Sequence, residues 1–385
     1  MNKLIESTSL INLALKKVAQ NNLMPPEGSS IGIAMSGGVD SSVAAALLSR
    51  MNYKVFGITG WLMEGAGKCC DSGMLDSARI SETLNIEHHS IDLREYFNST
   101  IISPFVSSYS VGRTPVPCMP CNTEVKWGSL LQSCASLGAD YLASGHYARL
   151  IKHKDGRLSI GRSKDQNKDQ SYMLWGLNQE QLSKTVFPLA NFTKDEIRAL
   201  AKEFELGNWD KEESQDICFI PNKTKDFLMD KLGERPGEIK EIKTGKVLGQ
   251  HSGTHFYTVG QRKGIGLSSA EPIYVIKLDP INNIVYVGEK SELYSSGLEV
   301  EFANWQIEPS DEPAYEPIRA MVKIRYNADA VPALVVPVSS VGDSKLFKVK
   351  FDSEVTSVTP GQAAVAYDSE NEFIIAGGWI SRAID

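Results

Sequence analysis

The stretch Ser36-Gly37-Gly38-Val39-Asp40-Ser41-Ser42 decides how the first half of the chain folds. It follows a compact apolar run, residues 30–35, which is typical of a buried strand. It precedes a segment rich in Ala and Leu, residues 43–48, which is typical of a helix. Glycines let backbone N–H groups approach an anion, and the helix N-terminus adds partial positive charge. We therefore predict a phosphate-binding loop, against the simpler alternative of a Gly/Ser turn capped by Asp40.

This loop lacks the phosphate-binding lysine of kinases and GTPases, whose pattern ends in Gly-Lys-Ser or Gly-Lys-Thr. Without that lysine, the loop is suited to holding pyrophosphate as a leaving group rather than to transferring the γ-phosphate. In this respect it resembles the loop of the ATP pyrophosphatases, which activate an oxygen by adenylation and release pyrophosphate. Asp40 is the candidate residue to help hold Mg²⁺.

Strands and helices alternate on either side of the loop. We predict further strands over residues 54–59, 88–92 and 141–143, and helices over residues 74–84 and 122–137. This alternation predicts a parallel, doubly wound sheet. Ligands on such sheets bind at the carboxyl ends of the strands. Both the phosphate loop and Ser144-Gly145-His146 follow predicted strands, so we expect both at that edge.

The pattern changes to period two from about Pro272. YVIKLD and IVYVG flank a turn, and RAMVKIRY, ALVVPV, KLFKVKF, QAAVAY and FIIAGGWI follow between turn-forming residues. Short strands at this spacing predict a small antiparallel barrel. We place domain boundaries accordingly: an N-terminal extension at 1–29, a nucleotide-binding domain at 30–221, a central domain at 222–285 and a barrel at 286–385.

The composition limits the class of protein. The chain has 385 residues, of which 42% are hydrophobic and 23% charged, which is typical of a soluble protein with two or three domains. No apolar run is long enough to span a membrane, and residues 1–22 lack the unbroken apolar block of a secretory signal. We expect a cytoplasmic protein without a membrane partner. The net charge of −7 excludes a uniformly basic surface but allows a local one, and residues 149–168 are rich in Lys and Arg.

Six cysteines in a cytosolic chain favour buried thiols, metal ligands or catalytic groups over a disulfide scaffold. Cys118-Met119-Pro120-Cys121 is the most informative cluster. With Asn122 at a predicted helix start, the helix dipole would lower the pKa of the Cys121 thiol. Cys69, Cys70 and Cys134 make weaker cases, and the spacing of Cys134 among leucines favours the core.

Four interpretations of Cys118, Cys121 and the distant Cys218 stay open at this point. They could be incidental thiols, three ligands of a structural zinc site that still lacks a fourth, ligands of an iron–sulfur cluster with one open iron, or a redox pair that carries sulfur. The sequence alone does not separate these interpretations.

Eight segments occur in order from about Ile31 onward: AMSGGVDSSVAA, CCDSGMLDSARI, GRTPVPCMPCNTEVKWG, LGADYLASGHYAR, KDQSYML, ESQDICFIP, YTVGQRKGIG and TPGQAAVAY. In these segments the chain resembles the tRNA-specific 2-thiouridylases of the MnmA/TrmU type. That resemblance implies a fold with an N-terminal doubly wound sheet of the PP-loop ATP pyrophosphatase kind (adenine nucleotide alpha hydrolase-like), a small central domain and a C-terminal antiparallel β-barrel.

The resemblance implies ATP-dependent 2-thiolation of the wobble uridine of tRNA, with ATP and Mg²⁺ as cofactors and a cysteine desulfurase or sulfur-relay protein as sulfur donor. Cys218 matches the cysteine that bears the persulfide and Cys121 its partner, and a [4Fe–4S] cluster on Cys118, Cys121 and Cys218 is the alternative. Gly60 stands where the family often has a larger apolar residue. The residues implied to contact ATP are Ala34, Met35, Ser36, Gly37, Gly38, Val39, Asp40, Ser41, Gly60 and Gly145.

The resemblance also implies residues that meet the tRNA. The uridine would have to be flipped out, because its C2 edge is inaccessible while the base is stacked. The flipped base would lie against Val116, Pro117 and Cys118. Cys118 stands where some members carry an aspartate proposed as acid or base. In the barrel segment acidic residues outnumber basic ones, which predicts a few specific contacts. The other residues implied to contact tRNA are His146, Lys168, Asp169, Gln170, Arg325, Tyr326 and Gln362.

Two rival functions make different predictions. Another adenylating enzyme, such as a ligase acting on a small carboxylate, would not need Cys121 or Cys218. A tRNA- or metal-binding module with an inactive nucleotide site would not turn over ATP.

Overall fold

The computed structural model describes residues 2–21, 23–64, 71–212, 217–308, 316–341 and 344–384. The chain divides into two compact units that do not follow chain order. The first unit holds residues 1–100 and 118–221, and the second holds residues 101–117 and 222–385. Within the part of the chain that is described, no helix is long and apolar enough to cross a membrane.

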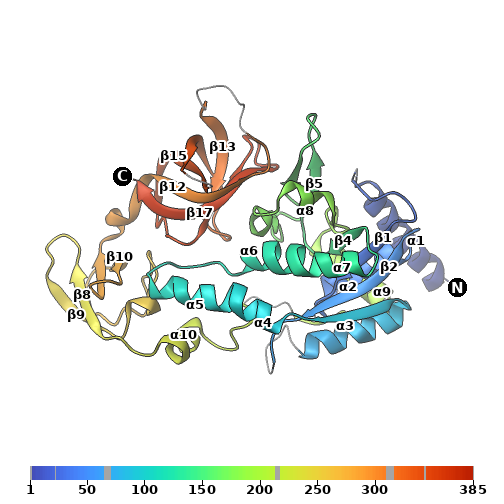
Figure 1. Cartoon of the computed structure of the whole chain (residues 1–385), viewed down its shortest axis with the longest axis horizontal. Helices are drawn as coiled ribbons and strands as arrows, with labels where there is room; N and C mark the ends of the chain where they lie inside the picture. Colours follow the sequence, from blue (N-terminus) through green and yellow to red (C-terminus); the bar gives the residue numbers. More distant parts are fainter. Residues whose placement is uncertain are drawn as a thin grey trace. The chain divides into compact units, whose positions relative to one another are not determined.

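The first unit is built on a five-stranded parallel sheet in the order β3-β2-β1-β4-β7 (Figure 1). This confirms the predicted doubly wound sheet. β1 is central, and its residues Ile31 and Ile33 are fully buried. A separate hairpin, β5–β6, carries part of the basic segment. The bounds are β1 Ser30–Ala34, β2 Lys54–Trp61, β3 Glu87–Asp92, β4 Tyr141–Ser144, β5 Arg149–Lys152, β6 Leu158–Gly161 and β7 Thr185–Val186.

Helices of the first unit include α2, which follows the phosphate loop directly and packs against α9 and β1. Its apolar residues are almost entirely buried, as expected for a helix that connects two parallel strands. The bounds are α1 Asn2–Ala19, α2 Val39–Ser49, α3 Asp71–Leu84, α4 Arg94–Phe97, α6 Cys118–Pro120, α7 Leu131–Ser136, η3 Ser171–Leu174, α8 Gln179–Ser183 and α9 Lys194–Glu203, with π-helical turns at η1 Asn98–Ile102 and η2 Cys121–Leu130.

The prediction of a helix start at Asn122 was wrong. The helix begins at Cys118, as α6, and continues through η2 into α7. Pro120 does not prevent this, because a proline in the first turn removes only an N–H that has no partner within the helix. Cys118 is therefore the first helical residue, and Cys121 lies one turn further in, where the effect of the helix dipole is weaker.

Residues of the N-terminal extension form α1, which lies against α2 and α9 (Figure 1). Its side chains Ala14 and Val18 are buried in the same core cluster as the sheet. Lys17 is ion-paired with Glu196 and lies over the ring of Phe192 at 5.3 Å. The extension is thus a packed part of the first unit.

Replacing Val18 with Asp is expected to lower the free energy of unfolding by about 2–4 kcal/mol, because it buries a carboxylate with no partner in the core. Leu13→Asp is the matched control, since Leu13 is 55% exposed on the same helix. Thermal unfolding would measure both variants. Equal melting temperatures for the two would contradict the docking of α1.

The second unit contains a helical pair and a four-stranded sheet in the order β10-β11-β8-β9. Residues Phe105 and Phe227 of the two helices meet edge-on at 6.2 Å between ring centroids. YVIKLD and IVYVG form strands as predicted but belong to this sheet. The bounds are α5 Ser103–Ser110, α10 Thr224–Leu232, β8 Gly237–Glu241, β9 Val247–His251, η4 Thr254–Phe256, β10 Tyr274–Asp279, β11 Ile284–Gly288 and η5 Lys290–Leu293.

A closed antiparallel barrel completes the second unit, as predicted, with its strands in the order β12-β15-β14-β13-β16-β17. Apolar side chains such as Phe347, Val349 and Val322 fill its interior, which is a packed core. The bounds are β12 Tyr294–Trp305, β13 Ile318–Lys323, β14 Val331–Val341, β15 Ser344–Thr356, β16 Ala363–Tyr367 and β17 Ile374–Ile384.

Candidate active site

The phosphate loop turns sharply between the end of β1 at Ala34 and the start of α2 at Val39. Gly37 has φ +68°, a conformation that residues with a Cβ rarely adopt. A Cβ there would lie 2.6 Å from the carbonyl oxygen of Gly73, so glycine is required by space as well as by the backbone angle. Met35 is buried, and its N–H donates to Ile58 O at 2.9 Å.

Serine hydroxyls of the loop form hydrogen bonds to its own backbone. Ser41 Oγ and Ser42 Oγ both donate to Gly38 O, at 3.1 and 2.9 Å. The Ser36 N–H donates to Ser41 Oγ at 3.3 Å. These bonds hold the loop in a single compact turn before any ligand is bound, which lowers the ordering cost of binding.

Gly145 brings the turn after β4 onto the loop. β1 and β4 are paired, with Ala34 opposite Ser144, so both turns leave the carboxyl edge of the sheet, as predicted. A Cβ at Gly145 would lie 2.6 Å from Ser41 N and 2.8 Å from Asp40 C. This backbone-to-backbone approach is possible only for glycine.

Asp40 is engaged by two side chains from elsewhere in the first unit. Lys194 Nζ lies 2.8 Å from each carboxylate oxygen, and Tyr147 Oη donates to Oδ1 at 2.8 Å. Lys194 is the first residue of α9, whose capping box is formed by Thr193 and Glu196. In this arrangement an ammonium group occupies the place where a divalent cation would bind the carboxylate.

Asn208 and Lys211 also bind the loop, through the Gly37 carbonyl oxygen. Asn208 Nδ2 donates to Gly37 O at 3.1 Å and to Ser42 Oγ at 3.0 Å. Lys211 Nζ donates to the same carbonyl at 3.1 Å and pairs with Asp76 at 2.7 Å. Sequence reasoning missed both residues, because no local pattern signals a partner more than 160 positions away.

Removing the Asn208 amide is expected to weaken ATP binding. Asn208→Ala deletes two hydrogen bonds to the loop, worth about 1–2 kcal/mol together, or about 5- to 30-fold in the dissociation constant of ATP. Asn208→Asp keeps the size but turns a carboxylate oxygen toward Gly37 O, so its loss should be larger. Titration with ATP measures both variants. Wild-type affinity in both would mean that the loop does not depend on this anchor.

Three side chains, through four hydrogen bonds, fix the helix that carries Cys118 and Cys121. Asn122 Nδ2 donates to Met173 O at 2.8 Å, and Trp175 Nε1 donates to Met119 Sδ at 3.1 Å. Gln181 Nε2 donates to the carbonyl oxygens of Thr123 and Trp127, at 3.0 and 3.1 Å. Carbonyls of a π-helical segment are thus satisfied by a side chain. Cys118 is exposed, and Cys121 is half-buried.

His146 joins this helix to the turn after β4. Lys126 Nζ lies 2.9 Å from Asn122 Oδ1 and 3.4 Å from His146 Nε2, and His146 Nδ1 lies 2.8 Å from Ser144 Oγ. Burial, followed by the neighbouring Lys126 charge, holds the pKa of His146 well below its usual range. The neutral ring therefore carries its proton on Nδ1, because the Lys126 ammonium can only donate to Nε2.

The remaining described cysteines differ in environment. Cys134 is fully buried against Gly32, and burial raises the pKa of its thiol to about 12, which confirms the predicted core position. Cys218 is half-buried beside Phe219, whose ring meets Phe97 edge-on at 5.9 Å. Cys69 and Cys70 lie outside the described residues.

No group of three or more His, Cys, Asp or Glu side chains is arranged to hold a metal ion within the described ranges. Cys118, Cys121 and Cys218 all lie in those ranges and do not form such a group. Their arrangement here therefore does not fit an iron–sulfur cluster.

The three expected tRNA contacts at residues 168–170 all make bonds within the protein, and the Lys168 N–H donates to Asp165 O at 3.1 Å. The Asp169 carboxylate is buried and accepts from Ser163 N at 3.0 Å and Ser171 Oγ at 2.7 Å. Gln170 Oε1 accepts from Tyr147 N at 3.0 Å. Both shape the turn on which the half-buried Lys168 lies. Contact of these three residues with tRNA stays a prediction.

Expected contacts on the barrel are also engaged within the second unit. Arg325 donates to the carbonyl oxygen of Ser357, and Lys323 lies over the ring of Tyr326 at 5.5 Å. Gln362 Nε2 donates to Thr114 O at 2.8 Å. Two of the expected uridine contacts lie in the segment before α6, where Val116 is half-buried and Pro117 is buried.

Gly60 lies on β2, opposite Ile91 of β3. A Cβ there would lie 3.2 Å from Leu93 Cδ1 and 3.3 Å from Leu62 Cδ2. A larger apolar residue would therefore have to displace these leucines.

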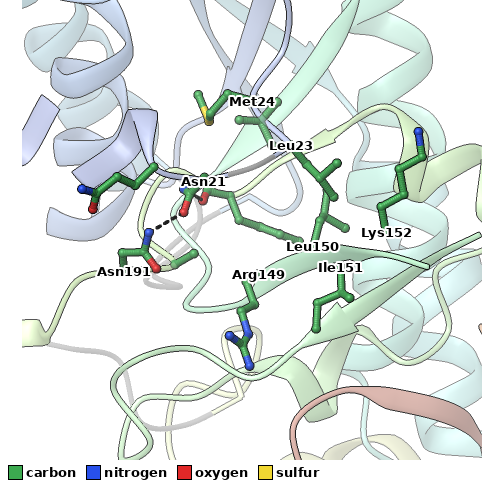
Figure 2. Close-up of a pocket in the computed structure, with 12 residues that line it drawn as sticks. Asn21, Leu23, Met24, Arg149, Leu150, Ile151, Lys152 and Asn191 are labelled. Carbon is green, nitrogen blue, oxygen red and sulfur yellow. Dashed lines mark hydrogen bonds between the residues drawn. The ribbon is translucent and has the colours of Figure 1, made fainter. Parts of the chain in front are cut away.

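A cavity of about 300 Å³ lies between the end of α1 and β5 (Figure 2). Two of its amide side chains bond to each other and to the backbone: Asn191 Nδ2 donates to Asn21 Oδ1 at 2.7 Å, and Asn21 Nδ2 donates to Phe187 O at 3.3 Å. Figure 2 shows the charged ends of Arg149 and Lys152 directed away from this pair. The cavity does not include the phosphate loop.

Family models match almost the whole chain. A model described as a tRNA methyl transferase HUP domain matches residues 29–222. A tRNA methyl transferase PRC-barrel domain matches residues 225–289, and an aminomethyltransferase beta-barrel domain matches residues 295–380.

Curated relatives match over nearly their full length. The tRNA-specific 2-thiouridylase MnmA of Picosynechococcus sp. is 46% identical over 91% of this chain and 98% of its own. The protein of the same name from Synechocystis sp. is 44% identical over 90% and 96%. A solved structure, the U34-tRNA thiolase NcsA from Methanococcus maripaludis with its [4Fe–4S] cluster, is 18% identical over 58% of this chain and 72% of its own, with a TM-score of 0.39.

Proposed function

Because this chain belongs to the family of tRNA-specific 2-thiouridylases, it is a tRNA-modifying transferase, and we propose that it exchanges the C2 oxygen of the wobble uridine of tRNA for sulfur. The observation that carries the proposal is the phosphate loop without a lysine at the carboxyl edge of β1 and β4. A site of this kind favours adenylation with loss of pyrophosphate, which is the activation that an inert carbonyl oxygen needs.

Activation comes first. ATP lies along residues 34–41 and against Gly145, where loop N–H groups and the N-terminus of α2 stabilise the charge of the departing pyrophosphate. The uridine oxygen attacks the α-phosphorus, so that a P–O bond forms to the base and pyrophosphate leaves. Mg²⁺ accompanies ATP and neutralises part of its charge. Asp40 does not hold the metal in this scheme, because Lys194 engages both oxygens of that carboxylate.

Sulfur transfer follows in two steps. The terminal sulfur of a persulfide on Cys218 attacks C2, and AMP leaves with the original oxygen. The Cys121 thiolate then attacks Cys218 Sγ, which breaks the sulfur–sulfur bond, releases the thiolated base and leaves a disulfide between the two cysteines. The sulfur-donor system, a cysteine desulfurase or relay protein with a thiol reductant, restores the thiols and the persulfide.

Substrate contacts complete the proposal. The flipped uridine lies against Val116, Pro117 and Cys118. The tRNA meets His146, the turn at residues 168–170, and Arg325 and Tyr326 of the barrel. Gln362, which the resemblance implies as a further contact, is left out because its amide donates to Thr114 O.

The direct test is mass spectrometry of nucleosides from unmodified tRNA incubated with the protein, ATP, cysteine and a cysteine desulfurase. We expect 2-thiouridine that disappears when ATP is omitted. If no thiolated base forms, in air or anaerobically, the proposal is wrong and another adenylating activity takes its place.

A further inference from the structure

Residues 101–117 leave the first unit and cluster with the second, and the chain re-enters the first unit at Cys118. Within the second unit, α5 packs against α10 through the buried ring of Phe105. The segment that follows α5, residues 111–117, leads directly to the first residue of the helix that carries Cys118 and Cys121.

Thr114 in this segment is held by the barrel through both of its backbone polar groups. Its N–H donates to Pro360 O at 2.9 Å, and its carbonyl oxygen accepts from Gln362 Nε2 at 2.8 Å. The residue between these two partners, Gly361, has φ +89°, and a Cβ on it would lie 2.9 Å from Thr114 N. The turn before β16 thus fits closely around one residue of the segment.

Two further contacts hold the same segment, and Gly112 packs closely against a proline. Arg113 pairs with Glu301 of β12 at 2.6 Å. Thr114 Oγ1 lies 3.2 Å from Thr258 Oγ1, and a Cβ on Gly112 would lie 2.8 Å from Pro280 Cγ. Residues 112–114 therefore contact both the barrel and the part of the second unit that contains the four-stranded sheet.

The backbone of Gln362 is held in the barrel by two hydrogen bonds. Its N–H donates to Thr359 O at 3.2 Å, and its carbonyl accepts from Ile380 N at 2.8 Å. The side-chain amide starts from a backbone locked into the barrel, so its position is set by the barrel. The N–H of Gln362 Nε2 that donates to Thr114 O is therefore engaged within the protein and not available to RNA.

We propose that Gln362 and Gly361 are positioning residues: they clamp Thr114 and thereby place Val116, Pro117 and Cys118 against the uridine. The inference rests on the proposed function. Only Pro115, Val116 and Pro117 separate Thr114 from Cys118, and the prolines fix two of the three φ angles. Such a short, stiff tether transmits the position of Thr114 to the residues that line the base.

The test separates positioning from direct tRNA contact. Gln362→Met keeps the side-chain length and removes the donor. We expect its single-turnover thiolation rate at saturating tRNA to fall about 10- to 100-fold, because misplacing a reacting group by about 1 Å has effects of this size. The dissociation constant for tRNA should stay within about twofold, since no RNA contact is lost. A normal rate with weakened tRNA binding would overturn the inference.

Gly361→Ala tests the clamp without removing any side chain that could reach RNA. It should lower the rate in the same way, since its methyl group displaces Thr114. Amide hydrogen exchange at Thr114 gives a readout that needs no activity, and we expect faster exchange in both variants than in the wild type. Unchanged exchange in both would also overturn the inference. If the wild-type protein thiolates nothing, the proposed function fails while the exchange result still reports on the clamp.

Discussion

Cys218→Ser is expected to abolish thiolation, with a loss of at least about a thousandfold, because a serine hydroxyl cannot carry the persulfide sulfur. The adenylation half of the reaction should survive, since the phosphate loop is untouched. We therefore expect ATP-dependent release of pyrophosphate in the presence of tRNA, without 2-thiouridine. In Cys121→Ser the reaction should stop one step later. The thiolated uridine should then remain joined to Cys218 through a sulfur–sulfur bond, and an added thiol reductant should release it.

Cys134→Ala is the matched control for loss of a cysteine. Cys134 is fully buried and its thiol has a pKa of about 12, so it is unreactive and serves only packing. Its replacement should cost some stability and leave thiolation intact at a permissive temperature. Wild-type thiolation by Cys218→Ser, with the donor system supplied, would show that the sulfur does not pass through Cys218.

Gly145→Ala is expected to lower ATP-dependent thiolation by at least about 100-fold, because the added methyl group would push the phosphate loop out of place. The collision is with backbone atoms, Ser41 N at 2.6 Å and Asp40 C at 2.8 Å, so no side-chain rotation relieves it. ATP binding should weaken along with the rate, because the loop itself is displaced. ATP titration together with thiolation under saturating tRNA measures both effects.

Gly207→Ala is the control for this substitution. A Cβ at Gly207 meets nothing within 4 Å, so we expect near-normal ATP binding and activity. If Gly145→Ala behaves like Gly207→Ala, the close approach of the two turns is not needed for ATP binding.

Local patterns predicted much of the fold. The apolar run before SGGVDSS and the Ala-rich run after it gave β1 and α2, because burial on both faces leaves near-continuous apolar sequence. Period-two alternation predicted the barrel strands, and the leucine spacing around Cys134 predicted a core position. The predicted helix start at Asn122 was wrong: the helix begins at Cys118, since a first turn accepts proline at position 120.

The sequence by itself determined the phosphate loop, the parallel sheet and the barrel, because these depend on the period of apolar residues and on the backbone needs of glycine. Only the tertiary structure decided what holds the loop and the segment before Cys118. Lys194, Asn208 and Lys211 reach the loop from more than 150 positions away, and Gln362 reaches Thr114 across 248. Such contacts leave no periodic signal, because they depend on how distant elements pack together rather than on the residues beside them.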